Sequence, residues 1–245
     1  MSEKTFKSYK VWDAPVRIFH GVNIISILVL LAAGLVIYNG SSFGVSGEGK
    51  ILLKKIHVYA GYVFSINLII RLVWAFMGNR HARFKGLLPM GKGYVDQLKA
   101  YWASLKTSKP QNYLGHNPLA RIGLSLLMLV LVFQAVTGLM LAGTDIYFPP
   151  FGQWIAEWVA AAGVDPTTLV PGNREMVDAA AYSEMRAFRK PYITIHEYGF
   201  FALLALIPIH IYMAVRSDRK YEGQIISGIF TGEKHFSSEP VDKDE

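Results

Sequence analysis

Cysteine is absent from this chain of 245 residues. Without thiolates the protein has no disulfides, no cysteine-ligated iron–sulfur cluster and no covalent c-type haem at a C-x-x-C-H motif. Any bound metal must therefore be held by histidine or by oxygen ligands, and any haem must be bound non-covalently.

Charge is scarce in four long apolar segments, which cover about residues 16–38, 53–77, 119–142 and 192–215. A helix needs about 20 apolar residues to cross a hydrocarbon core of about 30 Å. The sequence therefore predicts an all-α membrane protein, a single integral membrane domain over residues 1–245 folded as a four-helix transmembrane bundle in lipid. The first segment lacks a small-residue cleavage site, so we expect it to remain as an anchor.

Acidic residues are rare over residues 78–121, from the end of the second apolar segment to the start of the third, where eight basic residues accompany a single acid, Asp96. The loop over residues 143–191 has six acids and four bases. Because cytoplasmic loops are enriched in Lys and Arg, we expect both termini to be cytoplasmic and the long loop 143–191 to be external. The net charge of +7 then follows from topology, and nucleic acid is not an expected partner.

Four histidines lie within the apolar segments. His196 and His210 are fourteen residues apart in the last segment, which is about 3.9 helical turns, so both face one side of a helix roughly 21 Å apart. His57 lies near the external start of the second segment, and His20 lies near the cytoplasmic end of the first. Depth therefore predicts two pairs, His57 with His196 and His20 with His210.

Histidines at membrane depth are costly and usually functional. Two imidazoles from different helices are the ligand set of a six-coordinate haem b, so the pairs predict two stacked haems. One alternative is that each histidine is an individually satisfied polar residue of the bundle. Zinc is another, but two histidines per level are too few for a closed zinc site.

Four further residues are candidates for contact with the cofactors. Gly34 and Gly61 would let a flat macrocycle approach the backbone, or would serve helix–helix packing. Arg71 and Arg17 would pair with haem propionates, although Arg17 is also placed as an interfacial residue would be.

The remaining histidines, His81, His116 and His235, are expected to be solvated or capping residues. An amphipathic helix is expected over 94–105, a short interfacial helix at the start of the long loop, and Asn117 as a helix cap.

Five segments, in order along the chain, resemble the cytochrome b subunit of membrane-bound nickel–iron hydrogenases: DAPVRIFH (13–20), KKIHVYAGYVF (54–64), FMGNRHAR (76–83), GHNPLAR (115–121) and HIYMAVRSD (210–218). The wider group is the bacterial di-haem cytochrome b561-type superfamily, which includes the formate dehydrogenase gamma subunit. The resemblance implies haem b ligands at His20, His57, His196 and His210, in a multi-pass protein of the bacterial inner membrane.

The resemblance also implies the function. It is that of a quinone-reactive subunit, not an enzyme alone, which passes electrons between an external redox partner and menaquinone or ubiquinone. Asn23, Arg71 and Tyr212 are the expected neighbours of the quinone on the cytoplasmic side. Compared with the family pattern the stretch 146–190 is enlarged, so the partner stays open between a hydrogenase small subunit, a molybdenum oxidoreductase and a multihaem cytochrome c.

Three other functions are alternatives. The first is a stand-alone di-haem oxidoreductase linked to quinone, such as a superoxide oxidase. The second is a transporter without haem whose histidines relay protons. The third is a passive membrane anchor in which haem is structural. A fold hosts many functions, so the geometry of the site must decide between them.

Overall fold

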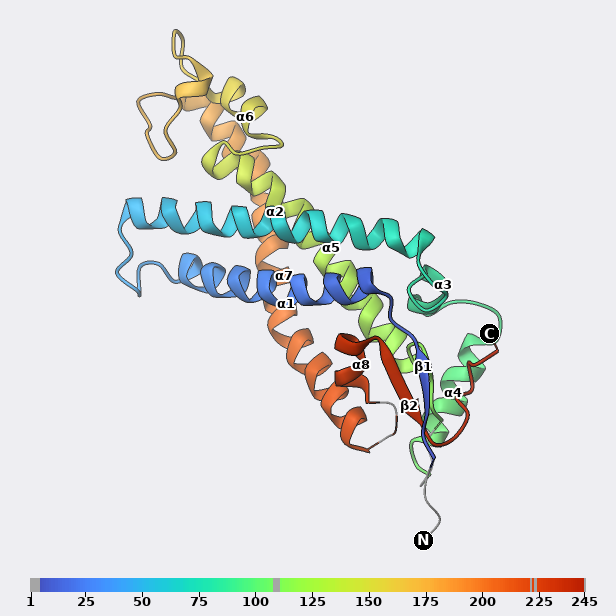
Figure 1. Cartoon of the computed structure of the whole chain (residues 1–245). Helices are drawn as coiled ribbons and strands as arrows, with labels where there is room; N and C mark the ends of the chain where they lie inside the picture. The colour runs from blue at the N-terminus through green and yellow to red at the C-terminus, as the bar shows by residue number, and fades with distance from the viewer. Residues whose placement is uncertain (1–4, 108–110, 221, 223, 245) are drawn as a thin grey trace. The chain divides into compact units, whose positions relative to one another are not determined.

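The computed structural model describes residues 5–107, 111–220, 222 and 224–244 (Figure 1). Helices and one pair of strands follow each other along the chain as β1 (Lys7–Lys10), α1 (Ala14–Tyr38), α2 (Gly47–Met77), α3 (Phe84–Leu87), α4 (Tyr94–Ser104), α5 (Pro118–Ile146), α6 (Gly152–Val159), the 3₁₀ helix η1 (Pro166–Thr168), α7 (Ala179–Lys220), α8 (Ile225–Thr231) and β2 (Glu233–Phe236).

Four of these helices, α1, α2, α5 and α7, are long and apolar enough to cross a membrane. They contain the four predicted segments, so this part of the prediction is confirmed. The helix ends differ most in α7, which begins at Ala179 rather than near residue 192. The polar residues that open α7 are good helix formers, and hydropathy alone does not detect them.

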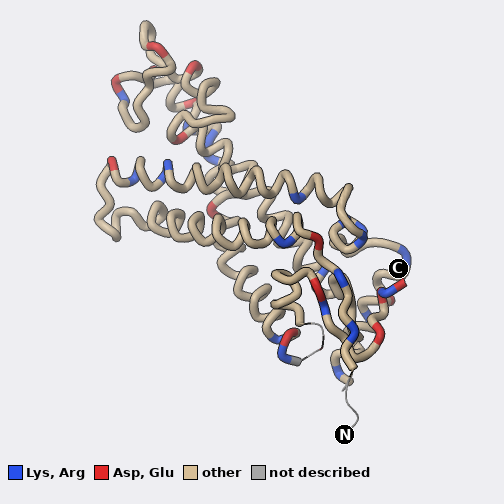
Figure 2. Tube along the Cα trace, in the orientation of Figure 1, with Lys and Arg blue, Asp and Glu red and all other residues tan. Residues whose placement is uncertain are grey.

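The surfaces of the four long helices are strongly apolar. Ile25, Phe76 and Tyr198 are 68%, 72% and 72% exposed, and many other large apolar side chains on these helices are exposed as well. Lys, Arg, Asp and Glu lie mostly near the helix ends and in the connecting segments (Figure 2). An apolar exterior of this extent is what lipid covers in a membrane protein.

Local chemistry sets where two of the long helices begin. α5 starts with Pro118, whose missing N–H costs nothing in the first turn, and the side chain of Asn117 accepts a hydrogen bond from Ala120 N at 2.8 Å. The expected cap at Asn117 is confirmed. α1 follows Asp13, whose carboxylate accepts from Val16 N at 3.4 Å. The amphipathic helix expected over 94–105 is also present, as α4.

By its internal contacts the chain divides into two compact units, each assembled from separate stretches of sequence. What we call the first unit comprises residues 1–22, 67–129 and 203–245, and the second unit comprises residues 23–66 and 130–202. The long helices contribute to both.

In the second unit, much of the segment expected to be an external loop is folded. It contains the expected short helix as α6, then η1 and the first turns of α7. A buried apolar cluster with Ile155, Val159 and Met185 at its centre holds these pieces together. Backbone hydrogen bonds from Ala161 N to Met176 O and from Asp178 N to Val159 O close the intervening chain. This segment is therefore a compact cap rather than an irregular loop.

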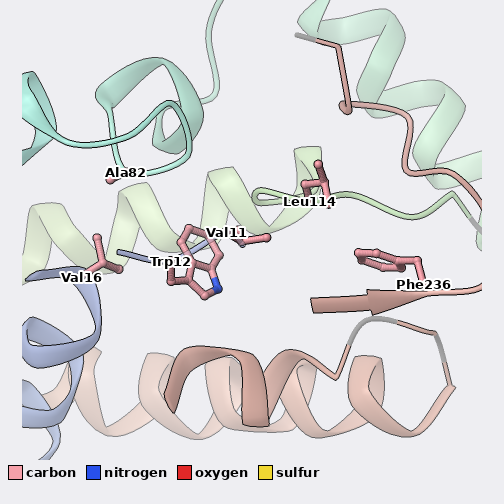
Figure 3. Packing of buried hydrophobic residues seen from close by; sticks show 6 residues of the cluster. All are labelled: Val11, Trp12, Val16, Ala82, Leu114 and Phe236. Atoms are coloured by element: carbon pink, nitrogen blue, oxygen red, sulfur yellow. The ribbon is translucent and has the colours of Figure 1, made fainter. Parts of the chain in front are cut away.

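The first unit contains the one clear departure from the all-α prediction. β1 and β2 pair antiparallel, with Lys7 opposite Phe236 and Lys10 opposite Glu233. Beneath this ladder lies an apolar core of Val11, Trp12, Val16, Ala82, Leu114 and Phe236 (Figure 3). Each strand has only four residues, too short a pattern to separate from the surrounding polar chain.

The C-terminal segment also fixes the turn that precedes α5. Asp242 accepts hydrogen bonds from Leu114 N at 2.6 Å and Gly115 N at 2.9 Å. Lys234 donates to the carbonyls of Tyr113 at 3.3 Å and Gly115 at 3.0 Å. Both side chains are buried, 9% and 4% exposed. We call this arrangement the tail clamp, because one acid and one base hold the same short turn.

Replacing Asp242 by Ala should open the tail clamp. It leaves two buried N–H groups without acceptors and costs about 3 kcal/mol, which corresponds to about a hundredfold more opening. Hydrogen exchange of the β1–β2 amides should accelerate accordingly. Asp244→Ala, which changes an exposed acid two residues away, should leave exchange unchanged; equal exchange in both variants would show that the clamp does not stabilise the sheet.

Candidate haem sites

In the second unit, His57 of α2 and His196 of α7 face each other. Their ring centroids are 6.2 Å apart and the rings are tilted by 71°. A metal ion lies about 2 Å from an imidazole nitrogen, so two rings on opposite sides of one iron have centroids roughly 6 Å apart when the ring radius of about 1 Å is included. The observed separation therefore fits one iron between these two rings.

The protonation of His196 is set by Thr137 of α5. The Thr137 hydroxyl lies 2.9 Å from His196 Nδ1 and donates its single proton to the Phe133 carbonyl at 2.6 Å. The hydroxyl oxygen must then accept from Nδ1–H, because a hydroxyl has only one donor. With the proton on Nδ1, Nε2 presents a lone pair. This is the tautomer that a metal-binding histidine needs.

Two glycines let neighbouring helices pack closely against the two imidazole rings. A methyl group on Gly138 would lie 3.2 Å from His196 Cε1, and one on Gly34 would lie 3.4 Å from His57 Cε1. Gly34 of α1 thus lies beside His57 of α2. Gly61 instead has Leu30 as its nearest neighbour, at 3.9 Å, which favours the alternative role in helix packing.

An ion-pair triad ties together the three helices around this pair. Asp145 of α5 binds Lys54 of α2 at 2.8 Å and Arg189 of α7 at 2.6 Å. Lys54 lies one turn before His57, and Arg189 lies two turns before His196. The triad therefore fixes the axial positions from which the two rings meet.

In the first unit, His20 of α1 interacts electrostatically with His210 of α7. Nδ1 of His20 is buried with no hydrogen-bond partner among the described residues. The same continuous helix, α7, thus contributes His196 to one unit and His210 to the other. Both predicted pairs bring their members near each other within one unit.

Arg71 and Arg17 lie in the same unit as His20. Arg71 is only 5% exposed, its charge faces Asp13, and its guanidinium carbon is 5.9 Å from the Phe19 ring. One terminal nitrogen of Arg71 and Nε of Arg17 are buried without partners in the described part of the chain. Buried N–H groups of this kind need an anion, and the haem propionates would supply one.

The donor set suits haem better than a bare metal ion. Across the described residues, no three His, Cys, Asp or Glu side chains come close enough together to hold a metal ion. A closed zinc site needs four protein ligands, whereas a haem iron needs only two. Each site offers two imidazoles.

The expectation that His81 is solvated was wrong, whereas His116 is half-buried. His81 is 9% exposed and Nδ1 of His116 is buried. Burial lowers the pKa of His116 to about 3, helped by the positive charge of Lys234. Burial also lowers the pKa of His81, as does Arg80, while Asp242 opposes the shift. Both rings contact Trp12, with centroids 4.8 Å away for His116 and 6.4 Å for His81.

Sequence reasoning also missed Thr137 and Gly138. They lie in α5, which contributes no histidine, and no local pattern marks them as neighbours of His196. The signal that could have found them is indirect: two small residues in succession within the charge-free stretch 122–144 suggest close approach of another helix.

Comparison with known proteins gives a consistent result. A family model described as prokaryotic cytochrome b561 matches residues 11–232. A probable Ni/Fe-hydrogenase B-type cytochrome subunit of Rhizobium leguminosarum bv. viciae is 32% identical, with 94% of this chain and 90% of the relative covered. Proteins of the same description from Bradyrhizobium diazoefficiens and, as the hydrogenase 1 subunit, Escherichia coli K12 are 28% and 29% identical, covering 92% of this chain and 85% and 90% of their own lengths.

Replacing Thr137 by Val should weaken cofactor binding at His196. The change removes the Nδ1 acceptor while nearly keeping the volume, and loss of such a partner typically costs about 10- to 100-fold in metal affinity. Haem retention during detergent titration and the redox potentials of the haems are the measurements. Thr144→Val, at another buried threonine of α5, is the control. Unchanged retention and potentials in Thr137→Val would argue against the assigned tautomer.

Proposed function

The chain belongs to the prokaryotic cytochrome b561 family, and we propose that it holds two b-type haems and carries electrons between a nickel–iron hydrogenase and the membrane quinone pool. His57 and His196 are the proposed ligands of one haem, and His20 and His210 those of the other. A bound haem supplies one-electron transfer, and two imidazole ligands leave no open coordination position for substrate. The protein is then a quinone-reactive subunit and not an enzyme alone.

The observation that carries this proposal is the His57–His196 pair. The 6.2 Å between ring centroids matches two ligands on one iron, and the hydrogen bond to Thr137 leaves Nε2 of His196 available. A histidine that merely satisfied itself in a bundle would need a partner for each polar nitrogen. A shared iron between the two rings would take up the remaining nitrogens, which supports the proposal.

The hydrogenase is proposed as the partner because the relatives are described as its B-type cytochrome subunits. Electrons would enter at the His57–His196 site, whose unit also contains the folded cap over 143–191. That cap is the proposed docking side. This chain is proposed to lie in the bacterial inner membrane with both termini in the cytoplasm. The segment between α2 and α5 and the residues next to the chain ends are rich in Lys and Arg, as cytoplasmic segments are.

Quinone is proposed to react beside the His20–His210 site. Arg71 supports this placement, because its buried guanidinium retains an N–H with no acceptor in the described chain and a quinone oxygen that gains negative charge would be stabilised by it. Tyr212 is 61% exposed on the surface of α7, where a lipid-soluble substrate would arrive. Asn23 is buried and belongs to the second unit.

The function is tested in membranes that contain the chain together with its hydrogenase. Hydrogen gas should reduce the b haems, and added ubiquinone or menaquinone should reoxidise them; membranes lacking the chain should show neither reaction. The hydrogenase should co-purify under mild detergent. Quinone reduction by superoxide from the chain purified alone, with no response to hydrogen in the membranes, would favour the stand-alone oxidase instead.

Replacing Arg71 by Ala should slow haem reoxidation by quinone about 10- to 100-fold, as expected for the loss of one buried charged hydrogen bond in the transition state. Both b haems should remain bound and reducible by hydrogen, since Arg17 remains as the second proposed propionate partner. Arg83→Ala is the matched control, since Arg83 is an exposed arginine that follows α2. Normal reoxidation in Arg71→Ala would remove Arg71 from the quinone site.

A further inference from the structure

The first unit contains a cluster of buried or half-buried titratable side chains that the electron-transfer function does not use. Its members are His81, which follows α2, His116, which precedes α5, Lys234 of β2 and Asp242 of the C-terminal segment. Burying four such groups costs free energy, and proteins usually retain this arrangement where it performs chemistry.

Contacts around Gly115 place these groups side by side. A methyl group built on Gly115 would lie 3.0 Å from His81 Nδ1 and 3.5 Å from Asp242 Oδ2, so both groups face the same α-carbon. Lys234 binds the Gly115 carbonyl at 3.0 Å. His116 follows directly in the sequence.

Trp12 forms one wall of the cluster. The centroid of its ring lies 4.8 Å from that of His116 and 6.4 Å from that of His81, and Lys234 Nζ is 5.4 Å from its centre. The three groups therefore lie around a single indole. Outside this wall Arg80, an exposed residue, donates through Nε to His81 Nε2 at 3.1 Å. His81 is thus in direct contact with an exposed residue.

Burial keeps the His116 imidazole neutral by lowering its pKa to about 3. Lys234, Arg71 and His81 add to this shift, while the hydrogen bond with the Gly86 carbonyl opposes it. A neutral imidazole can take a proton on one nitrogen as it gives up the proton on the other, which a fixed imidazolium cannot do. Nδ1 of His116 is buried and has no hydrogen-bond partner among the residues described, so it is available for this exchange.

The cluster is electrostatically connected to the proposed quinone site. Arg71, which acts on His116, also faces Asp13 and the Phe19 ring beside His20. All of these residues belong to the first unit. Protons reaching His116 would therefore arrive next to the place where the quinone is reduced.

We propose that His81 and His116 form a proton relay between the aqueous phase and the quinone site, a role that rests on the proposed function. Reduction of one quinone to quinol takes two electrons and two protons. The electrons come from the hydrogenase through the chain's two haem sites. Each proton passes from water through His81 to His116 and on to a quinone oxygen, and the relay histidines end in their starting state. Asp242 and Lys234 hold the turn that positions them.

The relay is tested in the complete complex with hydrogenase in membranes, with a short-chain ubiquinone as the acceptor. His116→Ala and His81→Gln should slow quinone reduction about a hundredfold, the scale of lost proton transfer. Reduction of the haems by hydrogen should remain as in the wild type. The solvent deuterium isotope effect should rise in both variants, and added imidazole should restore much of the rate in His116→Ala.

His235→Gln is the control, because His235 lies in β2 next to Lys234 and also has a buried Nδ1, yet it is not part of the cluster. It should behave as the wild type. Undiminished quinone reduction in both relay variants would overturn the proposal, and so would a loss that responds neither to imidazole nor to deuterium, since packing alone would explain it. If His116→Ala does not assemble, His116→Gln and His81→Gln decide by the same readouts. A wild-type complex that reduces no quinone with hydrogen would instead refute the proposed function.

Discussion

An imidazole inside an apolar helix bundle must have both ring nitrogens satisfied, because an unpaired buried polar group costs several kcal/mol in a membrane. His196 meets this condition on one side through Thr137. The other nitrogen would be satisfied by the proposed iron, and the ring of His57 lies 6.2 Å away between centroids, the separation that one iron would need. The glycines beside the rings and the Asp145 ion pairs follow from the same requirement, since they let the helices approach and fix their axial positions.

The first unit meets a different requirement: it must accommodate basic side chains in an apolar interior. Its positive side chains are Arg71, Arg17 and Lys234. Lys234 donates to a backbone carbonyl, and Arg71 interacts with the carboxylate of Asp13. Arg71 and Arg17 each keep one buried N–H that an incoming anion would accept from. The short β1–β2 sheet and the tail clamp enclose this region. A unit of this kind suits the handling of anions and protons, whereas the second unit offers the folded cap that a protein partner would contact.

Hydropathy was sufficient to predict the four long helices. Helical spacing grouped four histidines into two pairs, whose role as haem ligands stays a prediction. Both signals are local and periodic, so the sequence alone could place His196 and His210 on one face of one helix. The contacts of Thr137, Gly138 and His116 depend on which helices and strands meet, and no local pattern encodes that. The sheet was missed for a related reason: its four-residue strands lie in polar segments near the two ends of the chain, pair from Lys7–Phe236 to Lys10–Glu233, and have no periodicity to detect.

The central claim is that each histidine pair holds one haem b. The most direct measurement is the haem b content per chain, by pyridine haemochromogen assay, of the purified wild-type protein and of His57→Ala and His20→Ala. The account predicts two haems per chain in the wild type and one in each variant, with different redox potentials remaining in the two variants. One haem or none in the wild type, or loss of the same haem in both variants, would contradict it.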